Sequence, residues 1–537
     1  MKHTAYIYSL LSVLLVSVCI CACTFHEGLD IDECMHTEAE EGTYVHLDIK
    51  LFMGTRALAT TPKPGEDGDG REDGIRHEDD IKNITVFFYR NVKGLDADGT
   101  TEFLYSRYFA DYDKEWSTIS SSLGITFKIK DYVPEDGDHV VVIANAGDLT
   151  SLNTLQQLRD YQTYHAWRSG SSISNDDLFV MSSAYNESDE GKLFVTPYPG
   201  TQSQPFRTSM YIQRTAARID FMYNGSENYS SSNPNELYYD VKSTGGTTIS
   251  TVFLQNIIPV NLMQQSSYLI KRVTTTNEIT SSVRYGFRES GSAGVAPSTY
   301  VIEPHTLIKE NERVEELDTE LGTWYGSTRA SQVFASPNSC LGDANSIATY
   351  MATKTEKSEM SYFTHYMTLA YTNENTQSKE KHDPNFMTGL LLKATYVPTT
   401  VYSDASLTVA SYTKGTTFWR YTPTKASMVE EDSKYFTTEG AATAYKTAHP
   451  EDQAEIVEYP SGICYYNLWL RHANVEADPH ETFPMEYGIV RNNIYRVGID
   501  KFTGPGTLTP TFEGPTRVHL RIFVRPWNRR VHPEILL

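Results

Sequence analysis

Cysteines are the residues of this sequence whose spacing first suggests chemistry. Four of the six lie at positions 19, 21, 23 and 34. Thiolates bind Zn²⁺, but Cys-x-Cys-x-Cys inside an apolar run lacks the two-residue spacing that lets the side chains converge on one ion. Only Cys340 and Cys464 are left for the rest of the chain. We therefore predict no metal site, no other cofactor and no disulfide scaffold.

The same N-terminal cysteines lie in a targeting segment. Lys2 and His3 precede an apolar stretch from Ala5 to Ala22, after which the chain turns acidic, and this order is typical of a signal peptide. Ile20-Cys21-Ala22-Cys23 resembles a bacterial lipobox, in which a small residue precedes the lipid-bearing cysteine. We predict that residues 1–22 are removed and that lipid on Cys23 ties the precursor to a membrane.

Catalytic motifs are missing from the sequence. It contains no His-Glu-x-x-His, no Gly-x-Ser-x-Gly and no phosphate-binding Gly-x-x-x-x-Gly-Lys-Ser/Thr. The fifteen histidines are scattered singly. We therefore predict that the protein is not an enzyme. A glycosidase pair of carboxylates needs no local spacing, so an outer-membrane hydrolase stays as a third alternative.

The charge of the chain restricts its partners. Its 537 residues carry a formal net charge of −22. A nucleic-acid binder relies on Lys and Arg to neutralise phosphates, so nucleic acid is excluded as a partner. An anionic membrane surface would repel the chain as well, which leaves the lipid on the precursor as the only membrane contact that we expect.

A strand with one apolar face is expected just after the targeting segment. The stretch from Tyr44 to Met53 alternates strictly between apolar and other residues, which is typical of a half-buried strand. Its apolar face consists of Val45, Leu47, Ile49, Leu51 and Met53. A Pro- and Gly-rich linker over residues 60–80 follows, with eight carboxylates between Glu66 and Asp80, so no core can form there.

The rest of the chain is predicted to form short strands separated by Gly, Asp and Asn turns, with few helical segments. The pattern predicts strands over Met210–Met222, Leu390–Val397 and Leu407–Tyr412. It also predicts a short helix over Leu152–Arg159 and long loops from Thr274 to Lys381. Two β-sandwich domains, over residues 57–208 and 209–537, are the simplest all-β arrangement.

The last strand has the same kind of apolar face as the first. Within residues 517–526, one face carries Val518, Leu520, Ile522 and Val524. Either end strand could therefore fill the same hydrophobic slot, so a subunit that has lost its first strand could capture the last strand of a neighbour. The alternative is that both are ordinary edge strands of one protein. Five arginines and no carboxylate lie between Arg517 and Arg530, which makes this tail basic.

Several short motifs stand out along the chain. Besides Cys23 and the first strand with Thr55-Arg56-Ala57, they are Ile81–Phe87, Val142–Gly147, Arg214-x-x-Ala217-Arg218-Ile219, Trp469–Ala473, Glu486–Val497 and Val524–Trp527. Together these motifs resemble those of the fimbrillins, the lipoprotein-derived pilus subunits of Bacteroidales. The C-terminal motifs are most similar to the minor-fimbria shaft branch.

This resemblance implies two transthyretin-like β-sandwich domains and cleavage by an arginine-specific protease. Arg56 matches the cleavage position, Ala57 would become the mature N-terminus, and residues 23–56 would be the propeptide. Arg71 and Arg76 are alternative sites. Cleavage would free the first strand, and the C-terminal strand of another subunit, 517–526 or its continuation to Leu537, would replace it.

The resemblance thus implies an adhesive fimbria at the outer membrane, with other fimbrial subunits and a host or bacterial surface receptor as partners. The long loops allow an accessory or tip subunit as well as a shaft subunit. The alternative function is a non-polymerising surface lipoprotein that binds a glycan or a host protein.

Overall fold

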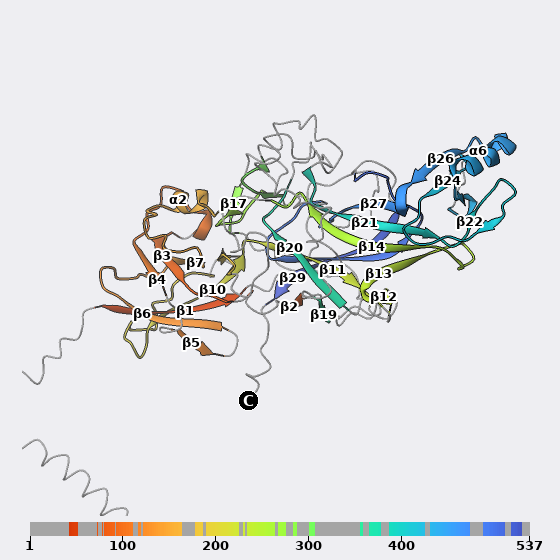
Figure 1. Cartoon of the computed structure of the whole chain (residues 1–537). Helices are drawn as coiled ribbons and strands as arrows, with labels where there is room; N and C mark the ends of the chain where they lie inside the picture. Colours follow the sequence, from red (N-terminus) through yellow and green to blue (C-terminus); the bar gives the residue numbers. More distant parts are fainter. Residues whose placement is uncertain are drawn as a thin grey trace, which may run out of the picture.

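The chain, seen as a computed structural model, is built mainly from β-strands (Figure 1). The structure describes residues 42–51, 72–73, 78, 80–91, 93–110, 116–119, 122–163, 178–185, 190–224, 229–230, 233–263, 267–274, 283–286, 300–306, 355–357, 365–376, 386–424, 430–472, 487–510 and 517–528. Within them, the strands form six sheets accompanied by two α-helices, which confirms the all-β fold class.

The N-terminal core is built on one eight-stranded sheet with the order β4-β3-β7-β9-β10-β1-β6-β5. Its strands are β1 (Thr43–Leu51), β3 (Ile84–Arg90), β4 (Tyr105–Phe109), β5 (Trp116–Ile119), β6 (Ser122–Ile129), β7 (Asp138–Ala144), β9 (Met181–Ala184) and β10 (Phe206–Arg214). The sheet folds over itself, with β1, β5, β6 and β10 below β3, β4 and β7 in Figure 1. Strand β7 is buried along its whole length, as expected for a run of Val and Ile inside a sheet.

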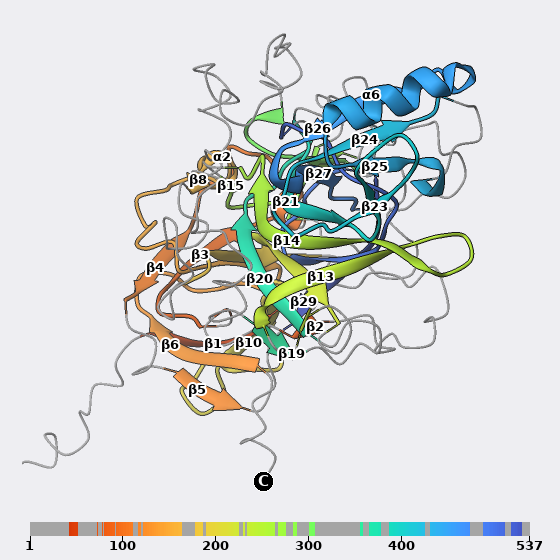
Figure 2. The same ribbon diagram turned by 45° about the vertical axis from the view of Figure 1, so that its right-hand side comes forward.

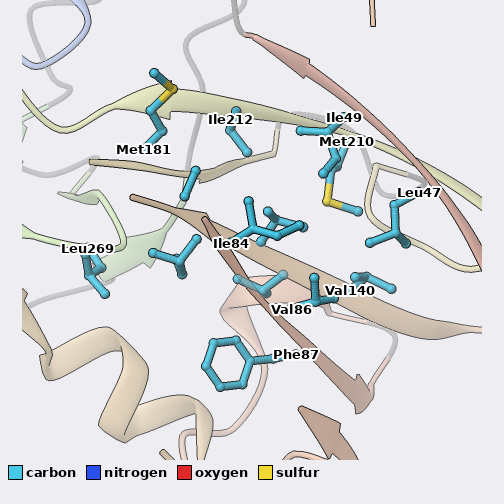
Figure 3. Close-up of a cluster of buried hydrophobic side chains, with 14 of the residues drawn as sticks. Leu47, Ile49, Ile84, Val86, Phe87, Val140, Met181, Met210, Ile212 and Leu269 are labelled. Atoms are coloured by element: carbon cyan, nitrogen blue, oxygen red, sulfur yellow. The ribbon is translucent and has the colours of Figure 1, made fainter. Parts of the chain in front are cut away.

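Side chains from both layers of this sheet meet in one hydrophobic cluster (Figure 3). Leu47 and Ile49 of β1 lie beside Met210 and Ile212 of β10, and Val86 of β3 belongs to the same cluster. The predicted short helix is present as α2 (Leu155–Asp160), with Thr154 and Gln157 forming a capping box at its N-terminus. Near it lie the 3-10 turn Gly94–Asp96 and the pair β8 (Gln162–Thr163) and β15 (Ser267–Tyr268).

The C-terminal core lies between two sheets. One has the order β19-β20-β11-β28-β29-β2 and the other β12-β13-β14-β21-β27. The first contains β2 (Glu72–Asp73), β11 (Ala217–Tyr223), β19 (Thr355–Lys357), β20 (His365–Thr372), β28 (Asn493–Phe502) and β29 (Val518–Asn528). The second contains β12 (Tyr229–Ser230), β13 (Asn233–Lys242), β14 (Thr248–Val260), β21 (Gly389–Pro398) and β27 (Ile463–Trp469).

Two smaller sheets are attached to the two cores, and the first of them contacts the N-terminal one, since Tyr285 packs against its hydrophobic cluster. One consists of β16 (Arg272–Thr274), β17 (Val283–Tyr285) and β18 (Tyr300–Ile302). The other consists of β22 (Val401–Tyr402), β23 (Val409–Ala410), β24 (Phe418–Thr422), β25 (Lys434–Phe436) and β26 (Glu455–Tyr459). It carries helix α6 (Glu439–Ala448) and the 3-10 turns Glu430–Asp432, Pro450–Asp452 and Pro460–Gly462, and it lies at the end of the molecule away from the N-terminal sheet (Figures 1 and 2).

The structure differs from the predicted elements in several places. Part of the stretch from Thr274 to Lys381, which we expected to form long loops, forms β17, β18, β19 and β20, and β20 pairs with β11 in the C-terminal sheet. The expected single strand Met210–Met222 is two strands, because the chain leaves the N-terminal sheet at Arg214 and enters the C-terminal sheet at Ala217. The two cores therefore meet a few residues after the 208/209 position at which we expected the domain boundary. Helix α6 was not predicted, since its alanine-rich sequence has a weak apolar period and its N-cap, Thr438, is one threonine among many.

Candidate functional site

Strand β1 lies in the middle of the N-terminal sheet. It pairs in parallel with β10, with Val45 opposite Phe206 and Leu51 opposite Ile212. On its other side it pairs antiparallel with β6, from Thr43 opposite Ile129 to Ile49 opposite Leu123. Loss of β1 would therefore leave unpaired backbone groups on both neighbours, which is the property of a slot that accepts another strand.

The apolar face of β1 is fully buried where its side chains are described. Val45, Leu47 and Ile49 are each 0% exposed. Burying each of them contributes about 1.5–3 kcal/mol, so their removal would uncover a large apolar surface. Leu51 is part of β1, although its side chain is not described, and Met53 lies outside the described residues.

The opposite face of β1 is polar and makes local contacts. His46 is hydrogen-bonded to Thr126 of β6 through Nδ1 and Oγ1 at 2.8 Å, and Lys50 pairs with Asp48 at 3.3 Å. Burial lowers the pKa of His46, and the positive charge of Arg207 lowers it further. This face adds specific contacts to the apolar anchoring of the strand.

The sheet order gives β1 a second role. Strands β6 and β5 form the end of the sheet beyond β1, so their ladder reaches the other strands of that sheet only through β1. Phe127 of β6 also touches the opposite layer, where its ring lies 5.1 Å from that of Phe109. Arg107 of β4 also donates to the backbone carbonyl of Lys128 at 3.3 Å. Loss of β1 would therefore leave the β5–β6 hairpin (116–129) held by such side-chain contacts with the opposite layer instead of by a backbone ladder.

The C-terminal strand β29 is engaged within its own domain. It pairs antiparallel with β28 from Asn493 opposite Pro526 to Phe502 opposite Val518. Val518 and Val524 are each 4% exposed, and the half-buried Leu520 and Ile522 pack against the same C-terminal core. All four predicted donor side chains thus share one face, as the alternation indicated, and in this state that face covers their own core.

Two of the arginines of the basic tail have acidic neighbours. Arg521 donates to Asp500 at 3.0 Å, and Arg517 lies 3.9 Å from Glu430. The Arg521–Asp500 pair is substantially exposed, so it contributes little to stability. Part of the positive charge of the tail is therefore balanced within the domain.

A buried ionic cluster lies where the linker after β1 reaches the two cores. Arg218 Nη1 contacts Glu78 Oε2 at 2.8 Å, and Arg218 Nη2 contacts Asp220 Oδ2 at 2.9 Å. Arg496 of β28 reaches the same Asp220 oxygen at 3.3 Å. Burial alone would lower the pKa of Arg218, but the negative charges of Asp220 and Glu78 raise it well above its ordinary value. Arg218 is therefore held in its charged form by its partners.

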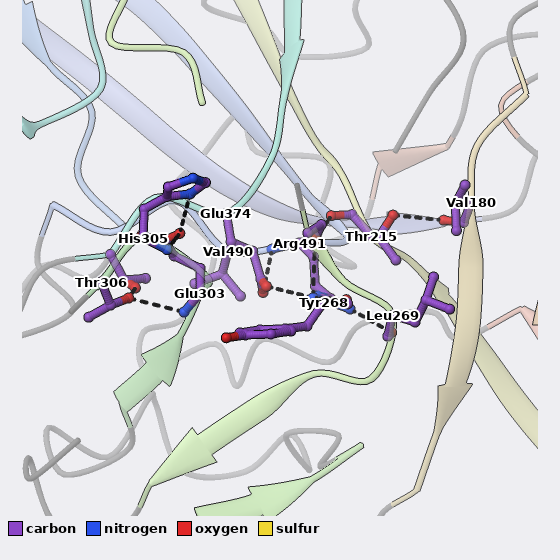
Figure 4. Close-up of polar contacts among 12 residues, drawn as sticks. Val180, Thr215, Tyr268, Leu269, Glu303, His305, Thr306, Glu374, Val490 and Arg491 are labelled. Atoms are coloured by element: carbon purple, nitrogen blue, oxygen red, sulfur yellow. Dashed lines mark hydrogen bonds and ion pairs between the residues drawn. The ribbon is translucent and has the colours of Figure 1, made fainter. Parts of the chain in front are cut away.

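A second buried ion pair lies close to the start of β28 (Figure 4). Arg491 Nη2 donates to Glu374 Oε2 at 2.7 Å and to the carbonyl of Tyr268 at 2.7 Å, and Arg491 Nη1 donates to the carbonyl of Leu269 at 3.1 Å. Leu269 belongs to the N-terminal hydrophobic cluster. Arg491 therefore ties the C-terminal sheet to residues that pack on the N-terminal core.

Sequence motifs pointed to some of these residues but not to their partners. Arg214 and Arg218 belong to one quoted motif, and Asn492 to another. The structure joins the two motifs, since Asn492 Oδ1 accepts a hydrogen bond from Arg214 Nη1 at 3.2 Å. Glu78 was missed because it is one carboxylate within an acidic run. Two arginines in an apolar strand need buried counterions. This requirement is the sequence signal from which a buried carboxylate such as Glu78 could have been predicted.

The predicted lipidation and cleavage residues, Cys23, Arg56, Ala57, Arg71 and Arg76, lie outside the described residues. In the described part, no three or more His, Cys, Asp and Glu side chains are grouped as a metal would require. No helix among the described residues is long and apolar enough to span a membrane.

Comparison with known families supports the resemblance at the C-terminal end. Residues 457–532 match the family model described as "Major fimbrial subunit protein type IV, Fimbrillin, C-terminal". The matched region contains β27, β28 and β29, so the family match includes both the predicted donor strand and its partner. A fimbrillin family is thereby supported. No curated protein matches the sequence.

Three of the solved structures that match this chain come from Parabacteroides distasonis and Porphyromonas gingivalis. A putative cell adhesion protein of Parabacteroides distasonis is 13% identical with a TM-score of 0.38, and covers 91% of this chain and 100% of its own. A fimbrilin of Porphyromonas gingivalis is 13% identical with a TM-score of 0.36, and covers 91% and 98%. The tip fimbrial protein Mfa3 of Porphyromonas gingivalis, with a C-terminal truncation, is 11% identical with a TM-score of 0.34, and covers 91% and 100%. Scores this low support no functional conclusion.

Proposed function

We propose that this chain is a structural subunit of an adhesive surface fimbria that polymerises by protease-triggered donor-strand exchange. Maturation removes residues 1–56, with lipid on Cys23 of the precursor and cleavage after Arg56. The observation that carries the proposal is the central position of β1, whose buried face of Val45, Leu47 and Ile49 is matched in pattern by the C-terminal strand.

The pairing of β29 with β28 restricts how strand exchange can take place. Because β29 pairs with β28 along most of its length, a donor that begins at Val518 must first leave its own sheet. Exchange is favourable only if β29 gains, in the slot left by β1, at least as much buried apolar surface and as many backbone hydrogen bonds as it loses by leaving β28. The donor segment of the proposal therefore includes the residues after Asn528 up to Leu537, which could enter the slot while β29 stays in place.

A peptide-binding experiment tests the exchange. A labelled peptide of residues 517–537 should bind protein that has been cleaved after Arg56, and an unlabelled peptide of residues 43–53 should compete with it. Binding should be absent from the uncleaved Arg56→Ala precursor, in which β1 still fills the slot. A second peptide carries Asp at Val518, Leu520, Ile522 and Val524: loss of its binding means that β29 itself enters the slot, and retained binding means that the residues after Asn528 do. Equal binding to cleaved and uncleaved protein would refute strand exchange.

N-terminal sequencing of protein released from the cell surface separates this function from its alternative. A chain that begins at Ala57 supports the pilus subunit and also distinguishes Arg56 from Arg71 and Arg76. A lipid-modified Cys23 retained in the functional protein would instead support the non-polymerising surface lipoprotein. Activity on a glycan panel that depends on particular carboxylates would support the hydrolase.

A further inference from the structure

The linker between β1 and β3 contains all three arginines that the sequence offers as cleavage sites. We propose that Glu78 anchors the end of this linker to the junction of the two cores, and that this anchor protects the bond after Arg76 from proteolysis. Cleavage is thereby directed upstream, and the mature N-terminal segment stays attached to the body after β1 has gone. The inference deepens the proposed function, on which the role of the protease rests.

Glu78 is held by four hydrogen bonds from three side chains, two on strands of the C-terminal sheet and one at the end of β10. Both carboxylate oxygens accept from Arg218 Nη1, at 3.0 and 2.8 Å. The hydroxyl of Tyr371 on β20 donates to Oε1 at 2.7 Å, and Arg214 Nε donates to the backbone carbonyl at 3.0 Å. Glu78 and Arg218 are both 0% exposed.

The chemistry of the cluster makes this anchor hard to release. If Glu78 moved out, Arg218 would keep Asp220 but lose one of its two counterions inside the protein. Asp220 also serves Arg496, so it cannot neutralise both arginines. A buried charge that loses its partner is strongly unfavourable, so excursions of Glu78 from this position are rare.

The linker is held at a second place before it reaches Glu78. Glu72 and Asp73 form β2, which pairs in parallel with Trp527 and Asn528 at the end of β29 (Figures 1 and 2). The bond after Arg76 therefore lies, in sequence, between two attached points. The bond after Arg71 directly precedes one of them.

A protease must bind several extended residues on both sides of the bond that it cuts, so attached residues close to that bond slow cleavage. For cleavage after Arg76, the second residue beyond the bond is the buried Glu78. Arg56 lies upstream of both attached points and beyond the end of β1 at Leu51. Among the residues that the structure describes, an attached one thus follows Arg71 directly and Arg76 at the second position, so both of these bonds lie close to an anchored point.

Limited trypsin digestion of the full chain tests the anchor without requiring a fimbria to assemble. Mass spectrometry and N-terminal sequencing would follow the new ends at Ala57, Glu72 and His77 over time. In the unaltered protein, the end at His77 should appear last. In Glu78→Gln, which keeps the shape but loses the charge, cleavage after Arg76 should be about tenfold faster or more.

Two further variants keep the test decisive. Tyr371→Phe removes one hydrogen bond to Glu78 but leaves the ion pair, so it should accelerate cleavage after Arg76 by a smaller factor and should fold even if Glu78→Gln does not. Glu135→Gln alters the exposed pair with Arg90 and should have no effect.

Early cleavage after Arg76 in the unaltered protein, or equal rates in Tyr371→Phe and Glu135→Gln, would overturn the proposal. Failure of fibre assembly alone would count against the proposed function and not against the anchor.

Discussion

At the scale of single residues, two buried ion pairs lie where the chain passes between the two cores. Arg218 and Arg491 are both fully or almost fully buried, and each faces carboxylates from a distant part of the sequence. Such pairs are costly to break because the remaining charge has no water around it. Buried ion pairs therefore favour one arrangement of the two cores more strongly than exposed pairs do.

Glu374→Ala tests this view at the second ion pair. The change leaves Arg491 buried with only neutral partners, so the free energy of unfolding should fall by about 3–5 kcal/mol. Chemical denaturation would measure the loss. The matched control is Glu135→Ala, whose pair with Arg90 is exposed and whose loss should hardly move the midpoint. Equal effects of the two substitutions would contradict a special role for the buried pair.

Cys464 gives a prediction for alkaline pH. Burial raises the pKa of its thiol to about 11 from an ordinary value of 9.0. Below pH 9 the thiol is protonated in both states, so its contribution to stability is fully present. Between pH 9 and 11 only the unfolded chain loses the proton, so the free energy of unfolding should fall by about 1.4 kcal/mol per pH unit.

Comparison with Cys464→Ala isolates this contribution from that of the buried tyrosines. Tyrosines away from Cys464 titrate alike in both proteins, so their contributions cancel in the difference between the two profiles. Tyr466, whose hydroxyl is hydrogen-bonded to the thiol, is taken out of the comparison by measuring both proteins with Tyr466→Phe. Urea denaturation from pH 8 to 11 should show a shallower decline for Cys464→Ala. Parallel profiles would mean that the thiol keeps its ordinary pKa in the folded protein.

At the scale of strands, β1 holds one end of the N-terminal sheet to the rest. Its removal should increase amide hydrogen exchange in the β5–β6 hairpin, because the ladder to β10 passes through β1. Mass spectrometry would compare the uncleaved precursor with protein cleaved after Arg56 and separated from the released strand. Strand β14, in the other core, is the internal control. Unchanged exchange at residues 116–129 would show that side-chain contacts with the opposite layer are enough to keep the hairpin in place.

Strands were predictable from the sequence to the extent that local alternation decides them. The stretch Tyr44–Met53 became β1, and the predicted strand Leu390–Val397 became β21, because each presents one regular apolar face. The expected strand Leu407–Tyr412 shrank to β23, since Leu407 has a positive φ of 61° and the chain turns there. Position within a sheet was not predictable. That β1 is central while β29 is nearly at an edge follows from pairing between distant segments.

The same limit applies to the candidate site. The apolar faces of β1 and β29 could be identified from alternation, and the Arg214 and Arg218 motif from its residue types. The junction of the cores could not, because it joins Glu78, Arg218, Tyr371 and Arg496, which are separated by up to several hundred residues. Only the folded chain shows that the acidic linker supplies a counterion for a strand of the second core.

At the scale of the whole molecule, the charges of the body and the tail differ in sign. The chain carries −22 overall, whereas residues 517–530 contain five arginines and no carboxylate. Asp500 and Glu430 balance part of the tail within the domain, so the attraction between subunits should be moderate. Charge complementarity of this kind raises the rate of encounter more than the final affinity.

The proposed tail should therefore bind a cleaved neighbour at a rate that falls as salt is added. Raising the ionic strength from about 0.01 to 1 M shortens the screening length from about 30 to 3 Å, so long-range attraction is lost. The association rate of the 517–537 peptide should decrease across this range, while its dissociation rate, set by buried apolar contacts, should change little. A peptide with Arg517, Arg521 and Arg525 changed to Gln is the control and should associate slowly at every salt concentration. Salt-independent association of the unaltered peptide would leave apolar burial as the sole basis for capture of the tail.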